Sequence, residues 1–340
     1  MIDLLVAGGG PVGLATALYA NHAGLTVRVF EPRTGVIDKA CGEGLMPGAV
    51  ARLHDLGVDP PGHPVRGIRY LAGDRQVTAG FRNGDGRGVR RTALHRALLE
   101  AAGMAGVSVV PQAVTTIAQD ESGVRVDGMR ARYLVAADGL HSPLRRLLGL
   151  EGTKATARRY GLRQHVGVAP WTDHVEVYWS DRAEAYVTPV DDDVIGVALL
   201  TGDRGAFAQQ LARFPDLRQR LTGAAVSSVR GAGPLHQPVR RRVAGRVLLV
   251  GDAAGYVDAL TGEGIALGLA QARAAAAAVA ADTPQRYAAD WQRITWRYRV
   301  ITGGLLGATR SSPMRRGLVP AAAALPGVFT AAVNQLTRSA

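Results

Sequence analysis

Glycines near the start of the chain have the spacing of a turn that binds a phosphate group. The stretch from Gly8 to Gly13 reads G-x-G-x-x-G and lies between an apolar run and a helical pattern. Glycines in this pattern allow a tight turn, close approach of the backbone to a pyrophosphate, and close helix–strand packing. The amino end of the following helix then faces the anion. We therefore predict a dinucleotide-binding turn with contacts from Gly8, Gly10, Pro11, Val12 and Gly13.

An acidic residue follows this turn where such folds bind a ribose. Glu31 lies at the end of the second apolar run, and a carboxylate there accepts hydrogen bonds from ribose hydroxyls. Arg33 lies two residues further on and is placed to reach an adenine ring or a 2′-phosphate. An exposed arginine without a ligand is the alternative for Arg33.

Two later apolar runs each end in an aspartate beside a glycine. The run 133–137 leads to Asp138-Gly139, and the run 246–250 leads to Gly251-Asp252. An aspartate at such a strand end can accept a hydrogen bond from a ribityl hydroxyl of a flavin. The second segment continues to a glycine turn that opens a helix, whose positive end can face the pyrimidine edge of a flavin. We predict flavin contacts at Asp138, Gly139, Asp252, Gly262, Gly264 and Ile265.

Three side chains near these segments are candidates for acid or base chemistry. Cys41 and Glu43 lie in a glycine-rich stretch, and Glu263 lies in the last glycine turn. A glutamate here acts as an acid or base at neutral pH only if burial raises its pKa. A buried cysteine without chemistry and glutamates that only hold a loop are the alternatives. Three dispersed histidines are further candidate bases for a phenol: His141, His165 and His236.

The elements that must position these residues follow from hydrophobic periodicity. Residues 2–7 and 25–30 are short apolar runs typical of buried parallel strands, and residues 11–23 between them have helical spacing. Residues 32–65 are rich in glycine and proline and have little periodicity, which predicts a long ordered or semi-ordered excursion. A further helix is expected over residues 91–102.

The rest of the chain predicts a second sheet and a helical tail. Strands are expected over 107–110, 113–117, 124–126 and 133–137. Three alternating runs between 160 and 200 predict an antiparallel sheet separate from the parallel one. Residues 246–250 return to the parallel pattern and precede an alanine-rich helix. The tail from about residue 286 predicts amphipathic helices with breaks at Pro313, Pro320 and Pro326.

Composition narrows the functional classes. Hydrophobic residues make up 47% and charged residues 20% of the 340 residues, as in globular proteins. The single cysteine excludes an internal disulfide, which is compatible with the cytoplasm. No pair of residues has metal-ligand spacing such as H-x-x-x-H, so no metal is expected. The G-x-S-x-G turn of a serine hydrolase is missing.

The net charge of +12 comes almost entirely from arginine, because Lys39 and Lys154 are the only lysines. Nucleic-acid binding would need a continuous basic face with interleaved aromatic residues. The arginine pairs are instead dispersed, and aromatic residues make up only 5% of the chain. We therefore expect a small anionic ligand and no nucleic acid.

The sequence gives no sign of secretion or of a membrane-spanning segment. Asp3 stands where a signal peptide has basic residues, and glycines interrupt the apolar run that follows. The most apolar later stretch carries Gln271 and Arg273, so it is expected to be a buried helix. These features favour a cytoplasmic protein without an integral membrane segment, and they do not indicate an oligomeric state.

The three glycine and aspartate motifs together resemble the FAD-dependent aromatic hydroxylase (group A flavin monooxygenase) superfamily. The segment from Lys39 to Pro47 is similar to the Cys-Gly-x-Gly-Leu-x-Pro stretch of its geranylgeranyl-reductase-like branch. The resemblance implies an α/β protein with a glutathione-reductase-type FAD-binding Rossmann fold, an inserted antiparallel β-sheet substrate domain and C-terminal helices. It also implies FAD as cofactor and NAD(P)H as a transient cosubstrate, since only one glycine-rich dinucleotide motif exists.

The same resemblance implies further residues and domain boundaries. Arg91, in Arg91-Thr-Ala-Leu94, corresponds to an FAD-contacting arginine, and Cys41 with Gly42 would pass near the flavin ring. Val114 completes the expected FAD contacts. The FAD-binding domain would comprise residues 1–65, 89–158 and 234–285. The substrate domain would comprise 66–88 and 159–233, and the C-terminal helical segment 286–340.

The sequence also departs from the family pattern. Asp258-Ala259 stands where the family has Asp-Pro before the last glycine motif, and the Trp-x-Trp-x-Ile-Pro motif of halogenases is absent. The Tyr-x-Trp-x-Phe-Pro motif of the reductase branch survives only as Tyr186-Val-Thr188-Pro189. The first departure removes a proline that helps to shape the flavin pocket in the family, and the second argues against halogenation.

Three functions remain open at this point. The sequence favours an NAD(P)H-dependent monooxygenase that hydroxylates an aromatic or polyketide-like molecule through a flavin hydroperoxide. The alternatives are a reductase of prenyl or other activated double bonds and a non-catalytic flavin-binding redox sensor. The small-molecule substrate would bind between the 160–200 sheet and the C-terminal helices. Apolar residues of the tail would cover the core or meet a partner chain: Leu318, Val319, Leu325, Val328 and Phe329.

Overall fold

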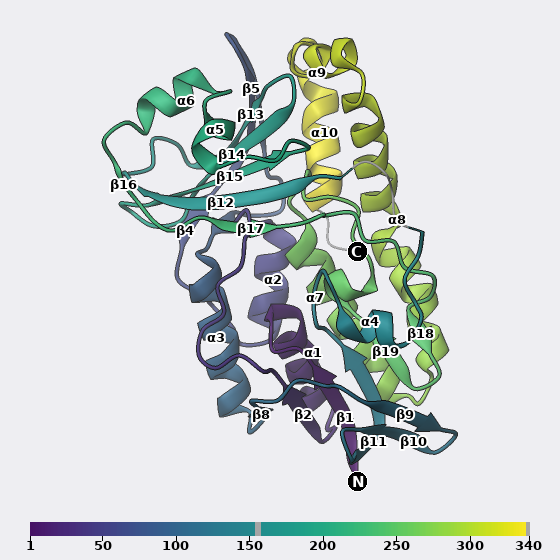
Figure 1. Ribbon diagram of the computed structural model, residues 1–340. Helices are drawn as coiled ribbons and strands as arrows, with labels where there is room; N and C mark the ends of the chain where they lie inside the picture. Colours follow the sequence, from purple (N-terminus) through teal and green to yellow (C-terminus); the bar gives the residue numbers. More distant parts are fainter. Residues whose placement is uncertain (154–157, 338–340) are drawn as a thin grey trace.

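A computed structural model describes residues 1–153 and 158–337 of the chain. Figure 1 shows a parallel sheet with its helices in the lower half and a second sheet in the upper half. The helices that follow α7 run up one side of both sheets and end beside the second one. The chain therefore visits each half more than once, as the sequence predicts.

The first sheet has the strand order β18-β19-β11-β1-β2-β8, with β9 and β10 attached through β11. β1 lies at its centre and pairs in parallel with β2 and β11, so that Val6 is opposite Val29 on one side and Val135 on the other. Its strands are β1 (Ile2–Ala7), β2 (Val27–Phe30), β8 (Ser108–Val110), β9 (Ile117–Asp120), β10 (Gly123–Val126), β11 (Met129–Ala136), β18 (Val243–Ala244) and β19 (Val247–Leu249).

Helices that pack on or beside this sheet include α1 (Pro11–His22), α3 (Arg91–Met104) and α7 (Gly264–Ala280). α1 and α7 approach closely because Gly268 has no side chain. A Cβ atom there would lie 2.4 Å from a methyl carbon of Val12. Since small residues let helix backbones come together, the alanine-rich sequence of α7 is explained by this packing.

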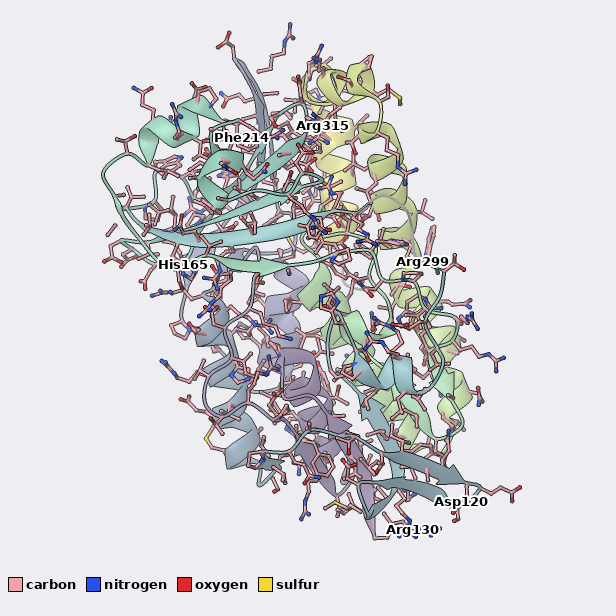
Figure 2. The ribbon with its side chains drawn as sticks, in the orientation of Figure 1. Asp120, Arg130, His165, Phe214, Arg299 and Arg315 are labelled. Carbon is pink, nitrogen blue, oxygen red and sulfur yellow. The ribbon has the colours of Figure 1, made fainter. Side chains whose placement is uncertain are left out.

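The second sheet has the order β16-β12-β15-β14-β13-β5-β6, and β17 also pairs with β12. All its pairs are antiparallel except β5 with β13. Helices α5 (Phe207–Leu211) and α6 (Pro215–Arg220) cover one face, where Phe214 packs (Figure 2). Its strands are β5 (Gly67–Ala72), β6 (Arg75–Gly80), β12 (Tyr160–Gly167), β13 (His174–Trp179), β14 (Ala183–Pro189), β15 (Ile195–Thr201), β16 (Ala225–Val226) and β17 (Arg230–Ala232).

A small third sheet is formed by three short strands between residues 44 and 88. It has the order β3-β7-β4, formed by β3 (Gly44–Leu45), β4 (His63–Val65) and β7 (Gly86–Gly88). Helix α2 (Pro47–Asp55) follows β3, so the excursion over residues 32–65 is ordered and contains a helix that the sequence analysis did not predict. Pro47 occupies the first turn of α2, where its missing N–H costs nothing.

Two other expectations are corrected. No strand covers residues 113–116, because Thr115 and Thr116 donate hydrogen bonds to the Asp127 side chain and the strand β9 starts only at Ile117. Pro320 does not break a helix but lies inside α9 (Ser312–Ala324). Pro313 and Pro326 do stand at helix starts, as expected.

The tail consists of α8 (Pro284–Thr309), α9 and α10 (Pro326–Thr337). Among the described helices, none is by itself long and apolar enough to cross a membrane. α9 and α10 meet that criterion only as a pair, and a bend of 103° separates them. Residues 338–340 of the predicted tail and 154–157 of the predicted FAD-binding domain lie outside the described residues. The exact domain boundaries stay predictions.

Candidate functional site

A cavity of about 500 Å³ lies between the two large sheets. The glycine turn, the Cys41 segment and the loops after β11 and β19 line one side of it. The inner face of the second sheet and the end of α10 line the other side. Residues from distant parts of the sequence therefore meet here, and the glycine and aspartate motifs lie together on one side, as the motif analysis predicts.

The glycine turn has no space for side chains. Gly8 has φ +108°, and a Cβ atom there would lie 2.4 Å from the carbonyl oxygen of Ala137. At Gly13 a Cβ atom would lie 1.8 Å from the carbonyl oxygen of Gly8. Helix α1 starts after Gly10, where no side chain caps its free N–H groups. These groups remain available to a pyrophosphate.

Glu31 is buried behind the turn and already has partners. Its carboxylate accepts a hydrogen bond of 2.8 Å from the Gly9 N–H and one of 2.7 Å from Nε of Arg33. Burial opposes ionisation, but the hydrogen bonds from Arg33 and Gly9 lower the pKa of Glu31. Arg33 lines the cavity, and its ion pair with Glu31 holds the guanidinium group in place there.

Four buried polar atoms of residues on the cavity wall lack a hydrogen-bond partner within residues 1–153 and 158–337. They are Nε of Arg91, Oδ1 of Asp138, Nε of Arg163 and Oε2 of Glu263. Unpaired buried polar atoms are rare and indicate a missing ligand or water. Together with the glycine cradle, they fit a ligand that carries a pyrophosphate, hydroxyl groups and a polar ring edge, as FAD does.

The two motif aspartates lie on the same wall. Burial raises the pKa of Asp138, although its carboxylate accepts a hydrogen bond of 3.0 Å from the Leu144 N–H. Burial also raises the pKa of Asp252, against the charges of Arg91 and Lys39. Both carboxyl groups are thus placed to exchange hydrogen bonds with ligand hydroxyls.

Glu43 connects the Cys41 segment to its surroundings. Its backbone has φ +60°, and its Oε1 accepts a hydrogen bond of 2.7 Å from the Arg91 N–H. Its Oε2 lies 2.7 Å from Nε2 of His165. Because both oxygens have partners, this geometry supports a positioning role for Glu43, while its proposed catalytic role stays a prediction.

Cys41 and Glu263 face the cavity as protonated groups. Burial raises the pKa of the Cys41 thiol, whose Sγ accepts a hydrogen bond of 3.4 Å from the Glu43 N–H. Burial raises the pKa of Glu263 to about 8, and only a hydrogen bond from Thr261 opposes it. A carboxyl group with this pKa holds its proton at neutral pH and can donate it.

The wall on the second sheet is largely apolar. Strand residues alternate between faces, so alternate residues of β14 and β15 face the cavity and the others face α5 and α6. The Tyr186 hydroxyl donates a hydrogen bond of 2.8 Å to the carbonyl oxygen of Leu260, which leaves its ring toward the cavity. The apolar lining includes Met46, Ile68, Tyr70, Val175, Val177, Ala198, Leu200, Val333 and Leu336.

Most predicted site residues come together in this cavity. Its lining contains Gly10, Pro11, Val12, Arg33, Cys41, Gly42, Glu43, Arg91, Asp138, Gly139, Asp252, Gly262, Glu263, Gly264 and Ile265. Gly8 and Gly13 belong to the glycine turn but do not line the cavity, and Glu31 lies behind the turn. Val114 is not part of the lining and packs against the core of the first sheet. Its predicted role as an FAD contact therefore has no support from the cavity.

The sequence analysis missed several residues of the wall. Lys39 lies 3.3 Å from the Cβ position of Gly139, and burial together with nearby arginines lowers its pKa. Tyr70 and Val333 come from β5 and α10, for which no motif exists. Of the histidines, only His141 lines the cavity, since His165 pairs with Glu43 and His236 is exposed.

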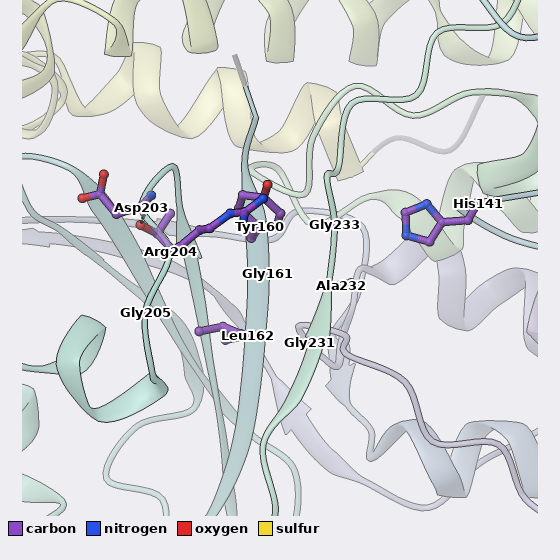
Figure 3. Close-up of a pocket in the computed structure, with 11 residues that line it drawn as sticks. His141, Tyr160, Gly161, Leu162, Asp203, Arg204, Gly205, Gly231, Ala232 and Gly233 are labelled. Atoms are coloured by element: carbon purple, nitrogen blue, oxygen red, sulfur yellow. Dashed lines mark hydrogen bonds between the residues drawn. The ribbon is translucent and has the colours of Figure 1, made fainter. Parts of the chain in front are cut away.

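A smaller cavity of about 390 Å³ adjoins the first one across β12 and β17. The two share His141 and the glycines of both strands. Figure 3 shows Tyr160, Asp203 and Arg204 gathered at one end of this cavity and His141 at the other. A hydrogen bond from Arg204 lowers the pKa of Tyr160. This end of the cavity is therefore polar.

The fold and the site define a flavoprotein that binds FAD. A family model described as FAD binding domain matches residues 1–286, and the chain belongs to this family. The resemblance to aromatic hydroxylases and geranylgeranyl reductases is thereby confirmed, as is the FAD-binding α/β fold. The chain is an FAD-dependent oxidoreductase.

Relatives and one solved structure extend this result. Menaquinone reductase of Mycobacterium tuberculosis (strain ATCC 25618 / H37Rv) is 32% identical over 311 residues, which cover 81% of this chain and 75% of that protein. Digeranylgeranylglycerophospholipid reductase 1 of Methanothermobacter thermautotrophicus is 26% identical, covering 86% and 82%. The solved anhydrotetracycline hydroxylase OxyS of Streptomyces rimosus has a TM-score of 0.76 at 21% identity, covering 99% and 75%.

Proposed function

We propose that the chain is an FAD-dependent reductase that saturates a carbon–carbon double bond in the isoprenoid chain of a lipid. The protonated acids of the cavity carry this proposal. Glu263, with a pKa of about 8, holds a proton at neutral pH, and so does the Cys41 thiol. Saturation of a double bond needs a proton donor, whereas hydroxylation of a phenol is assisted by a base.

The apolar wall supports an isoprenoid substrate. It is formed by aliphatic and aromatic side chains of β5, β13, β14, β15 and α10, which exclude water and match an extended hydrocarbon chain. The names of both curated relatives describe reductases of molecules with isoprenoid chains. The segment from Lys39 to Pro47, which resembles the geranylgeranyl-reductase branch, lies on the side of the cavity that faces this apolar wall.

The reaction balances as a two-electron reduction. One alkene carbon gains a hydride, the other gains a proton, and NAD(P)H is oxidised to NAD(P)⁺. Bound FAD supplies the chemistry of hydride transfer between cosubstrate and substrate. Arg91, Asp138 and Asp252 would bind the cofactor, the apolar wall orients the double bond, and Glu263 delivers the proton from its carboxyl group. The cytoplasm, which supplies reduced pyridine nucleotide, is the location that we propose.

Hydroxylation, which the sequence alone favours, is the second candidate. Lys39 supports it, because burial and neighbouring charges lower the pKa of this lysine and make it a possible base for a phenol. The solved hydroxylase with the same fold shows that such a scaffold can host this reaction.

Anaerobic turnover separates the two candidates. The purified yellow protein is incubated with NADH or NADPH and either a menaquinone or a digeranylgeranyl lipid, and the products are analysed by mass spectrometry. A gain of two hydrogen atoms without oxygen supports the reductase. Substrate-stimulated oxygen uptake with a phenolic compound, and no anaerobic product, would establish the hydroxylase. A protein that fails to bind FAD would contradict both.

A further inference from the structure

The junction of α9 and α10 is an exposed apolar corner. We define the elbow as residues 321–328, in which α9 ends and α10 begins after a bend of 103°. Leu325 is 59% exposed and Val328 is 65% exposed. Met314, on the same helix pair, is 58% exposed. Single exposed apolar residues are common, but a contiguous group of them indicates an interaction site.

The sequence of this region has no charged residue over positions 317–337. One residue in five is charged in the chain as a whole, so several would be expected here. A helix at the surface of a protein in water normally carries polar residues on its outer face. The outer face of α10 instead presents Val328, Ala331 and Ala332 to the surroundings, with the exposed and uncharged Gln335 beside them.

Four exposed arginines, which we call the rim, belong to elements beside α9 and α10. Arg75 starts β6, which packs on both helices, Arg182 lies in the β13–β14 turn, Arg310 precedes α9, and Arg316 lies within α9. Arg316 bonds Asp181 in the β13–β14 turn at 3.0 Å, which fixes this turn against α9. The described acids beside these arginines are Asp74, Asp181 and Asp203, of which Asp203 lies 3.7 Å from Arg182, so the rim keeps a small net positive charge.

The elbow is joined to the cavity by the inner face of α10. Phe329, one residue after Val328, packs on Tyr70 with ring centroids 4.8 Å apart, and Tyr70 lines the cavity. One turn further along, Val333 lies in the cavity wall, followed by Leu336. An apolar path therefore leads from the elbow to the site along one helix.

We propose that the elbow docks on the surface of an anionic lipid bilayer. Leu325 and Val328 would enter the boundary between headgroups and acyl chains, and the rim arginines would contact lipid phosphates. A second copy of the chain is a poorer occupant, because a symmetric contact would bring the basic rims of both copies together. The further step, entry of a membrane lipid into the cavity along α10, rests on the proposed reductase function.

Vesicle flotation tests the docking without any substrate. The FAD-loaded full chain is mixed with vesicles of phosphatidylcholine alone or with added phosphatidylglycerol. We expect binding to the anionic vesicles that weakens with salt. The double substitution Leu325→Glu and Val328→Glu should lower the bound fraction about tenfold. Met104→Glu is the matched control, since Met104 is 82% exposed on α3 and lies away from the elbow.

Several results would overturn the docking. The wild type could fail to bind anionic vesicles, or the elbow variant could bind them as well as the wild type does. In a third outcome, neither protein binds vesicles and the substitutions convert a dimer to a monomer, which would assign the elbow to contacts between copies. An unchanged flavin spectrum and melting temperature show that the variant is folded.

Activity assays distinguish failure of the docking from failure of the proposed function. With a prenyl substrate dispersed in detergent, the elbow variant should keep wild-type turnover, because neither residue lines the cavity. With the substrate embedded in vesicles, its turnover should fall with its binding. Vesicle binding without reduction of any prenyl substrate would reject the function and keep the docking. Turnover of dispersed substrate without vesicle binding would reject the docking and keep the proposed function.

Discussion

Oε2 of Glu43 lies 2.7 Å from Nε2 of His165, and this contact joins the loop before β3 to strand β12 of the second sheet. The other carboxylate oxygen accepts the hydrogen bond from the Arg91 N–H at the start of α3. A single buried side chain therefore connects three elements around the cavity. Its position depends on a left-handed backbone conformation at Glu43, which non-glycine residues rarely adopt.

Glu43→Ala should destabilise the protein and weaken FAD binding. The change leaves the Arg91 N–H without its acceptor, and an unsatisfied buried group costs about 1–3 kcal/mol. We expect a melting temperature lower by several degrees and a raised Kd for FAD, measured by flavin fluorescence. Glu43→Gln keeps the size and one acceptor, so its effect should be smaller. Equal melting temperatures for the wild type and the alanine variant would reject the positioning role.

Gly13→Ala should abolish FAD binding. The added Cβ atom would lie 1.8 Å from the carbonyl oxygen of Gly8, so the turn that faces the pyrophosphate must move. The measurement is the ratio of flavin to protein after purification, with circular dichroism as the check on folding. Gly303→Ala in α8 is the matched control, because nothing lies within 4 Å of its Cβ position. That control should keep FAD and gain up to about 1 kcal/mol in helix stability. A yellow Gly13→Ala protein would contradict the prediction.

The FAD side of the site was largely predictable because it depends on local sequence. Strand–turn–helix motifs place Gly10, Asp138 and Asp252 at strand ends, and parallel strands bring those ends to one edge. The role of Glu31 was harder to predict, since its pairing with Arg33 depends on a side-chain conformation. Val114 failed to reach the cavity because Asp127 holds the neighbouring threonines in a loop.

The substrate side was not predictable to the same degree. Tyr70 and Val333 are 263 positions apart and meet only because α10 packs against β6, beside β5. No local pattern encodes such a contact. Helix α2 was missed because glycine and proline around it suggest a loop, although Pro47 is favourable at a helix start. The alternating pattern of the β14 sequence predicted a strand. It did not show which face of the strand lines the cavity, because this depends on the helices that cover the other face.

Ala198→Phe should weaken binding of a prenyl substrate and leave FAD binding unchanged. Ala198 lies on the cavity face of β15, and a phenyl ring there would fill space that the substrate needs. We expect KM to rise about tenfold or more, since each lost buried CH₂ group is worth about 0.8 kcal/mol. The control is Ala118→Phe, at an exposed position of β9. Unchanged KM in the cavity variant would show that the substrate binds elsewhere.

The rate of double-bond reduction should fall as the pH rises through about 8. Glu263 has its pKa raised to about 8 by burial, so it is protonated below this pH and loses the proton above it. Glu263→Gln cannot donate a proton, and we expect a rate at least about 100-fold lower without the inflection. Glu100→Gln, at an exposed position of α3, serves as the control. An inflection near pH 8 that persists in Glu263→Gln would assign the proton to another group.

The raised pKa of Glu263 also makes the free energy of unfolding depend on pH. The pKa of Glu263 in the folded protein, about 8, exceeds its ordinary value of 4.5, so the folded state binds more protons between these values. The free energy of unfolding should therefore fall as the pH rises from about 4.5 to 8. Glu263→Gln removes this dependence, because the amide stays neutral. In urea unfolding of the FAD-free protein, the variant should become more stable relative to wild type as the pH rises. A constant difference across this window would mean that Glu263 has the same pKa in both states, and its part as the proton donor would then lose its physical basis.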